Sequence, residues 1–235
     1  MGGQMSRWRK KRTGRENTPS LPAEITRIAP QKRRNDRYSL YHEDRFLIGV
    51  SRESLTEFEL KEGEILTEDQ YKSILLTEER RAAKEYLIRL LARRDHSRNE
   101  LETKALKKGF DREMISPALE QLENSGYLNE EEFAEKYACD QLRFHQWGPL
   151  KIRNGLIRKG VTSATVDKVL SKLSDDWELE KICVDLAVKR KRHFSREEEK
   201  RKRRDKVAAY LLRKGFTYEI IQRTLPEIIR KLNAD

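Results

Sequence analysis

Three glycines that each follow a pair of basic residues mark an internal repeat, and this repeat constrains the fold more than any other feature of the chain. The motifs are Lys107-Lys108-Gly109, Arg158-Lys159-Gly160 and Arg213-Lys214-Gly215, so the glycines lie 51 and 55 residues apart. Apolar residues recur eight, four and three positions before each glycine, and six, ten and thirteen positions after it. This spacing predicts one apolar helix face before the glycine and another after it.

Each glycine suits the turn between its two helices. Glycine readily takes the left-handed conformation that ends a helix, and basic residues in the last turn face the negative end of the helix dipole. A polar residue two positions later, Asp111, Thr162 or Thr217, is available to cap the second helix. The repeated apolar positions are Leu101, Ala105, Leu106, Ile115, Leu119 and Leu122; Ile152, Leu156, Ile157, Val166, Leu170 and Leu173; and Val207, Leu211, Leu212, Ile221, Leu225 and Ile228.

A third helical stretch precedes each pair, over residues 82–92, 131–142 and 177–188. The middle helix of the first and third repeats should begin at the capping-box patterns Ser97–Glu100 and Ser195–Glu198. In the second repeat, Gly148-Pro149 places proline at the first helical position. Each repeat is therefore predicted to be a three-helix unit.

The composition agrees with stacked repeats rather than with one deep core. Only 36% of the residues are hydrophobic and 39% are charged, whereas typical globular domains have about 45–50% and about 25%. We predict an all-α protein in which three tandem three-helix repeats form an elongated, curved body. The predicted repeats span residues 77–128, 129–173 and 174–235.

Two N-terminal segments are expected before the repeats. Residues 1–37 carry eleven Lys/Arg against three Asp/Glu and few periodic apolar positions, which predicts a flexible, disordered basic tail. Residues 38–76 should form a β-hairpin, with its turn at 42–44, and a short helix. Ser51 is the expected N-cap of that helix, and Thr67 that of the next.

The sequence contains no recognisable catalytic motif or metal-binding pattern. GxSxG, Walker-type, HExxH and CxxC motifs are all missing, and the two cysteines and four histidines are scattered. We therefore expect neither an enzyme nor a bound cofactor or metal. Because no apolar window approaches the roughly 20 residues of a membrane span and the N-terminus lacks an apolar signal region, we expect a cytoplasmic protein without membrane contact.

Three segments resemble the RecX family of recombinase regulators: LLARRDHSRNELETKALKKGF (90–110), GYLNEEEFAEKYACDQ (126–141) and GPLKIRNGLIRKGV (148–161). The resemblance covers about residues 38–232 and is weaker in the third repeat. It implies a non-enzymatic inhibitor of the RecA recombinase, whose three-helix repeats lie in the helical groove of the RecA nucleoprotein filament. Such a protein would modulate recombination, DNA repair and the SOS response.

Basic residues recur at corresponding places in the repeats and form the candidate surface for RecA or DNA. The segment 187–214 alone carries thirteen basic and four acidic residues. Trp147, between two predicted helices, is either a partner anchor or a turn residue over the core. Tyr127 and Trp177 are expected to pack in the core. The candidate cations are Arg93, Arg94, Arg98, Lys107, Lys108, Arg143, Lys151, Arg153, Arg158, Lys159, Lys189, Arg190, Lys191, Arg192, Arg201, Arg203 and Arg204.

Other interpretations of these cations stay open at this point. The charges could be solvated helix faces, or they could hold single- or double-stranded nucleic acid directly, because Lys/Arg contacts to phosphate need no motif. The repeats could also form a scaffold for another partner. Steep weakening of binding with salt would favour direct phosphate contacts. We expect the protein to act as a monomer.

Overall fold

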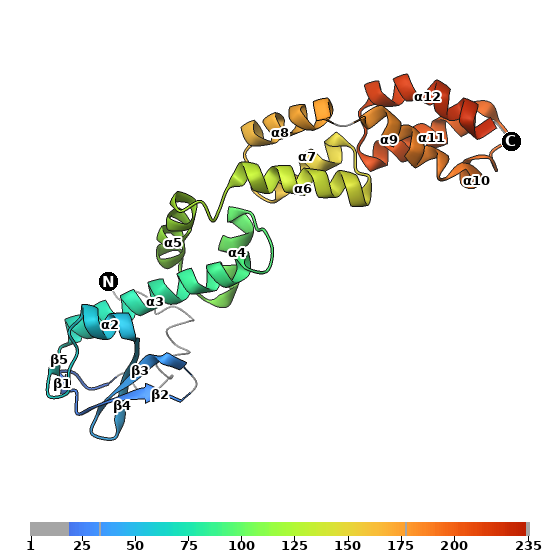
Figure 1. The fold of residues 1–235 in the computed structure, drawn as a ribbon. Helices are drawn as coiled ribbons and strands as arrows, with labels where there is room; N and C mark the ends of the chain where they lie inside the picture. Colours follow the sequence, from blue (N-terminus) through green and yellow to red (C-terminus); the bar gives the residue numbers. More distant parts are fainter. Residues whose placement is uncertain (1–18, 33, 177, 234–235) are drawn as a thin grey trace. The chain divides into compact units, whose positions relative to one another are not determined.

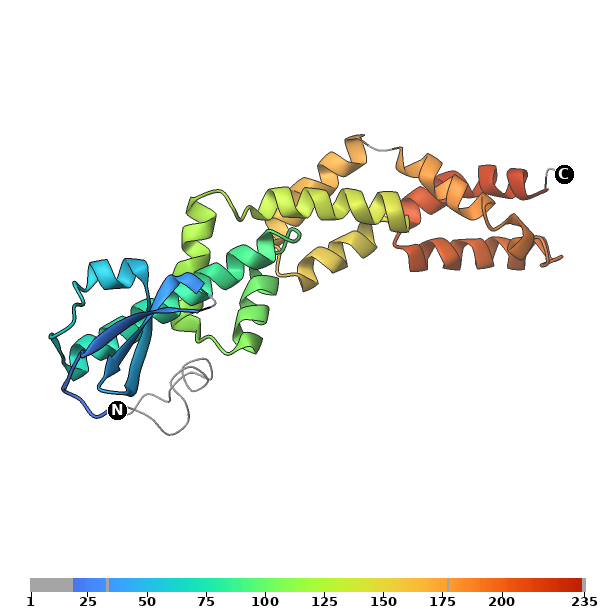
Figure 2. The same ribbon diagram turned by 60° about the horizontal axis from the view of Figure 1, so that its bottom comes forward.

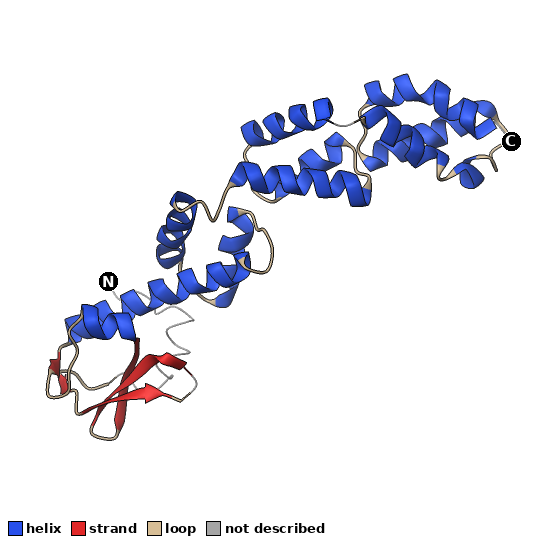
Figure 3. Cartoon of the chain, in the orientation of Figure 1, coloured by secondary structure: helices blue, strands red, loops and turns tan. Residues whose placement is uncertain are grey.

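The computed structural model describes residues 19–32, 34–176 and 178–233 (Figure 1). Contacts divide the chain into two compact units. The first unit contains Met1–His96 and Leu101–Leu128, and the second contains Ser97–Glu100 and Asn129–Asp235. All the strands lie in the first unit, and the second unit is helical over its described residues (Figure 3).

The first unit begins with a small antiparallel sheet. Strands β2 (Arg27–Gln31), β3 (Arg34–His42) and β4 (Arg45–Ser51) pair in that order, and β1 (Ala23–Glu24) pairs separately with β5 (Ile65–Leu66). The hairpin of β3 and β4 confirms the strands expected on either side of residues 42–44, and Glu43 takes a left-handed φ of 53° in its turn.

The flexible tail predicted for residues 1–37 is wrong for residues 23–37. These residues supply β1, β2 and the start of β3, and Ala23 and Ile25 are buried in the core of the sheet. Their apolar residues are few, and their burial depends on strands that come later in the chain. Residues 1–18, the rest of the predicted tail, lie outside the described residues.

A buried carboxylate ties the sheet to the helices of the first unit. Glu78 lies in α3 (Glu68–Leu91) and is only 2% exposed. It accepts hydrogen bonds from the Ser51 amide, the Ser51 hydroxyl and the Ser54 hydroxyl, each at 2.8 Å. Arg37 of β3 donates to its other oxygen at 2.6 Å. Since Ser51 caps α2 (Arg52–Glu57), as expected, this Glu78 network joins a strand pair and two helices.

The three repeats have the predicted three-helix composition. Repeat 1 consists of α3, α4 (Arg98–Lys108) and α5 (Arg112–Asn124); repeat 2 of α6 (Glu130–His145), α7 (Pro149–Arg158) and α8 (Ser163–Asp176); and repeat 3 of α9 (Leu179–Val188), α11 (Lys200–Lys214) and α12 (Tyr218–Asn233), with the short α10 (Lys191–Phe194) inserted (Figure 2). Helix α3 begins at the Thr67 capping box and runs across the boundary predicted at residues 76–77.

The glycine turns and most of the apolar positions are as predicted. Gly109, Gly160 and Gly215 have left-handed φ values of 104°, 81° and 92°. The apolar residues at positions −8, −4, +6, +10 and +13 relative to each glycine are all buried, and each repeat has its own core. The residues at −3, however, are exposed in all three repeats, because consecutive residues on a helix are rotated by about 100°.

One predicted helix start is wrong and another is correct. Ser97 and Glu100 form the expected capping box through reciprocal hydrogen bonds of 3.2 Å. Ser195 instead ends α10, and α11 begins only at Lys200 after its N-cap, Glu199. The fully buried Phe194 fixes α10 against the core of repeat 3, which the local capping pattern does not reveal. Trp177 lies outside the described residues.

Candidate interaction surface

The middle helix of each repeat ends in an exposed apolar residue followed by two cations. We call these the repeat-end triplets: Leu106-Lys107-Lys108, Ile157-Arg158-Lys159 and Leu212-Arg213-Lys214. The three apolar side chains are 37%, 44% and 48% exposed, and each leads into a left-handed glycine. Single exposed apolar residues are common on protein surfaces, so the feature that marks these three as a candidate contact surface is their recurrence at the same position of every repeat.

In the second unit, the start of α7 docks on the end of α11, and we call this contact the Gly148 joint. The Gly148 amide donates to the Lys214 carbonyl at 2.7 Å, and the Leu150 amide donates to the Gly215 carbonyl at 2.9 Å. A Cβ on Gly148 would lie 2.3 Å from the Phe216 nitrogen. Only glycine therefore fits there, and the positive end of one helix dipole meets the negative end of the next.

An equivalent contact, the Ser97 joint, lies at the end of α7. The Ser97 hydroxyl donates to the Lys159 carbonyl at 2.6 Å, and the Lys159 Nζ lies 2.7 Å from the Glu100 carboxylate. A Cβ on Gly160 would lie 2.6 Å from the Asn99 Cβ. Gly160 and Gly215 thus serve both the helix-ending turn and the close approach of the first turn of the preceding middle helix, through Asn99 and Lys151 respectively.

Several predicted site residues already form ion pairs or hydrogen bonds within the protein. Arg153 pairs with Asp167, and Lys159 pairs with Glu100. Arg203 donates to the Glu197 carbonyl at 2.8 Å and to the Asn233 side chain at 2.6 Å, so it fastens the start of α11 to the end of α12.

The remaining predicted cations lie on exposed or half-buried helix ends and turns. Arg201 and Arg204 are exposed in the first turns of α11, where the helix dipole disfavours cations. Lys189, Lys191 and Arg192 line a hollow of about 660 Å³ at the turn between α9 and α10. The others are exposed except for the half-buried Lys151: Arg93, Arg94, Arg98, Lys107, Lys108, Arg143, Lys151, Arg158 and Arg190.

The aromatic residues are distributed differently from the prediction. Trp147 lies in the turn before α7, half-buried against the core of repeat 2, with the Lys151 Nζ 4.6 Å from its ring centroid. Tyr127, expected in the core, is 72% exposed, and Phe144 and Tyr218 are 70% and 69% exposed. Sequence reasoning missed these three because a lone aromatic residue near a helix end carries no exposure signal.

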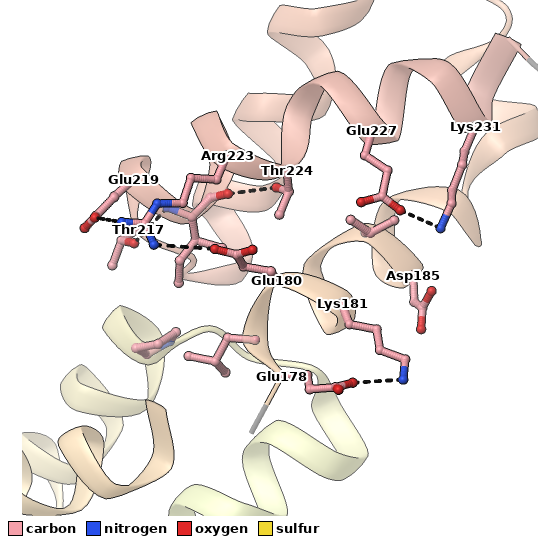
Figure 4. A pocket seen from close by; sticks show the side chains of 14 residues that line it. Glu178, Glu180, Lys181, Asp185, Thr217, Glu219, Arg223, Thr224, Glu227 and Lys231 are labelled. Carbon is pink, nitrogen blue, oxygen red and sulfur yellow. Dashed lines mark hydrogen bonds and ion pairs between the residues drawn. The ribbon is translucent and has the colours of Figure 1, made fainter. Parts of the chain in front are cut away.

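A groove of about 830 Å³ lies between α9 and α12, away from the predicted site residues (Figure 4). Its three cations are already neutralised, since Lys181 pairs with Glu178, Lys231 with Glu227, and Arg223 with Glu180 and Glu219. Within the part of the chain that the structure describes, no group of three histidine, cysteine or carboxylate side chains is placed to hold a metal ion. The groove is therefore lined largely by ion pairs, with five carboxylates against three cations.

Models of the RecX family match the chain over most of its length. The RecX N-terminal domain matches residues 23–67, and the first, second and third three-helix domains of RecX match residues 83–122, 129–170 and 178–225. The chain belongs to the RecX family. These RecX domains coincide with the sheet and with the three repeats, in the same order.

Curated relatives and solved structures agree with this family. "Regulatory protein RecX" of Clostridioides difficile is 32% identical over 205 residues, covering 87% of this chain and 95% of that protein. The RecX protein of Listeria monocytogenes is 28% identical, covering 89% of this chain and 77% of its own length. A crystal structure of a regulatory protein RecX has a TM-score of 0.72 at 24% identity, covering 86% of this chain and 98% of that chain.

A second RecX structure, from Lactobacillus salivarius, has a TM-score of 0.60 at 24% identity and covers 65% of this chain and 97% of that chain. At this identity, the two structures support the fold alone. No helix among the described residues combines the length and the apolarity needed to cross a membrane.

Proposed function

We propose that this protein is a regulatory, inhibitory RecX protein that binds the RecA recombinase filament in its helical groove. In this role it acts as a cytoplasmic monomer without catalysis and modulates recombination, DNA repair and SOS-related activities. The name of the relatives, "Regulatory protein RecX", supports a regulatory role. The contact with RecA is the part that this proposal adds.

The observation that carries the proposal is the threefold recurrence of the repeat-end triplets. Leu106, Ile157 and Leu212 occupy the same position in three repeats, and each remains exposed although the apolar residue directly before it is buried. A filament of identical protomers presents the same surface repeatedly, so a chain with three equivalent contact elements suits such a partner. Multivalent contacts also raise the overall affinity above that of any single contact.

The triplets can be tested with the variant Leu106→Ser/Ile157→Ser/Leu212→Ser. Because exposed apolar anchors at an interface each contribute on the order of 1 kcal/mol or more, we expect binding to RecA filaments to weaken by about a hundredfold. Co-sedimentation with RecA filaments on single-stranded DNA measures this. The fold should persist, since none of the three side chains belongs to a core.

A matched control replaces three exposed apolar residues outside the triplets, as Phe46→Ser/Ile65→Ser/Ile88→Ser, whose side chains are 42%, 60% and 43% exposed. This control should sediment with RecA like the unchanged protein. Equal binding by the triplet variant and the unchanged protein would contradict the role given to the triplets.

A further inference from the structure

The Ser97 and Gly148 joints are built alike but carry opposite charge at one position. Nine residues before the repeat glycine stand Glu100 in repeat 1 and Lys151 in repeat 2. Each faces the lysine that directly precedes the next glycine. In the Ser97 joint, Glu100 and Lys159 form a half-buried ion pair of 2.7 Å. In the Gly148 joint, the equivalent lysine is Lys214, and the partner is a second cation.

The cations of the Gly148 joint lie close enough to affect one another. Burial, together with the nearby charges of Lys151 and Arg190, lowers the pKa of Lys214. The Lys214 Nζ donates to the His145 carbonyl at 3.2 Å. The Arg190 guanidinium lies 4.9 Å from the ring centroid of Tyr210.

No carboxylate of the described residues neutralises this cluster. Across residues 19–32, 34–176 and 178–233, neither Lys151, Arg190 nor Lys214 forms an ion pair. In the Ser97 joint, by contrast, the equivalent position holds the acidic Glu100, which pairs with its lysine. Like charges brought together by folding cost free energy, and such an arrangement is typical of a site that binds an opposite charge.

We propose that Lys151, Arg190 and Lys214 form a binding site for the phosphodiester backbone of nucleic acid, assembled when repeat 2 docks on repeat 3. A guanidinium can bind two phosphate oxygens at once, and the two lysines supply compact charges beside it. The cationic hollow lined by Lys189, Lys191 and Arg192 flanks Arg190 in the sequence and extends the positive surface, which suits a polyanion better than a single carboxylate. This contact with nucleic acid requires no RecA.

The variant Lys151→Glu tests the site because it should change stability and binding in opposite directions. It places a carboxylate opposite Lys214, as Glu100 lies opposite Lys159 in the Ser97 joint. This new ion pair should offset the loss of the contact between Lys151 and the Trp147 ring, so the thermal midpoint of the second unit should stay equal or rise. Affinity for a fluorescein-labelled oligothymidylate, measured by fluorescence anisotropy at low salt without RecA, should fall by about tenfold or more. In the variant Lys151→Gln, the affinity should fall less steeply with salt: the magnitude of the slope of log affinity against log salt concentration should decrease by about 1.

The control variant Lys84→Glu makes the same change in net charge at an exposed position of the first unit. It should weaken oligothymidylate binding by less than Lys151→Glu does, and Lys151→Arg should retain binding.

Added inorganic phosphate should compete only weakly, because a single anion contacts fewer cations than a phosphodiester chain. Unchanged oligothymidylate affinity in Lys151→Glu and Lys151→Gln would overturn the proposed site. Loss of both affinity and stability in these variants would also overturn it, because that result indicates a structural role for Lys151. Since RecA is absent, neither result bears on the RecA proposal.

Discussion

Replacement of Glu78 by alanine is expected to lower the free energy of unfolding of the first unit by about 3–5 kcal/mol. The change leaves the buried Arg37 guanidinium, only 3% exposed, without its ion-pair partner. It also removes the acceptor of two serine hydroxyls and one amide. Hydrogen exchange of the β3 and β4 amides in the full chain measures the effect, since these strands should lose protection first.

Glu85→Ala is the matched control on the same helix. Glu85 forms an exposed ion pair of 3.5 Å with Arg89, and loss of such a pair costs about 0.5 kcal/mol or less. Equal protection of β3 and β4 in both variants would show that the Glu78 network does not hold the sheet to α3.

The same carboxylate should make the first unit sensitive to acid. Burial alone would raise the pKa of Glu78, but the hydrogen bonds from Ser51 and Ser54 and the charge of Arg37 outweigh it and lower the pKa. A depressed pKa in the folded state adds stability that is fully present above the unfolded pKa, near 4.3, and is lost as pH falls through the folded value. The urea midpoint of the unchanged protein should therefore fall below about pH 4 more steeply than that of Glu78→Gln.

Replacement of Gly215 by alanine is expected to open the Gly148 joint. Its φ of 92° costs a residue with a side chain about 1–2 kcal/mol, and a Cβ there would lie 2.4 Å from the Lys151 Cβ and 2.6 Å from the Lys151 nitrogen. Overpacking of this kind adds about 1–3 kcal/mol. The Gly148 and Leu150 amides, which donate across the joint, should exchange faster in hydrogen-exchange measurements.

Gly126→Ala separates the backbone strain from the contact. Gly126 also has a positive φ, 73°, but nothing lies within 4 Å of the position of its Cβ. Its replacement should cost only the conformational strain. If both alanine variants destabilise the chain equally, close approach at the Gly148 joint contributes nothing.

The repeats could be predicted from the sequence because each depends on local signals. Apolar spacing, capping residues and glycines such as Gly160 act within one or two turns of a helix, and the structure follows them at nearly every position. The strands of residues 23–37 carry weak local signals, because their stability depends on pairing with β4 and β5 and on the contact of Arg37 with Glu78, 41 residues away.

The candidate surface was predictable in composition but not in geometry. The cations before each glycine are visible in the sequence, whereas the exposure of Leu106, Ile157 and Leu212 depends on which side of each helix meets its core. The sequence likewise contains Glu100 and Lys151 at equivalent positions. Their importance becomes clear only when the joints place them opposite Lys159 and Lys214.

The regulatory role is tested most directly by ATP hydrolysis of RecA filaments on single-stranded DNA, with this protein added below one molecule per RecA protomer, at two salt concentrations. Hydrolysis should fall well before the protein equals RecA in number, and the Leu106→Ser/Ile157→Ser/Leu212→Ser variant should lose this effect. Hydrolysis that is unchanged, or that falls only when the protein exceeds the available DNA sites, would contradict regulation through contact with the filament.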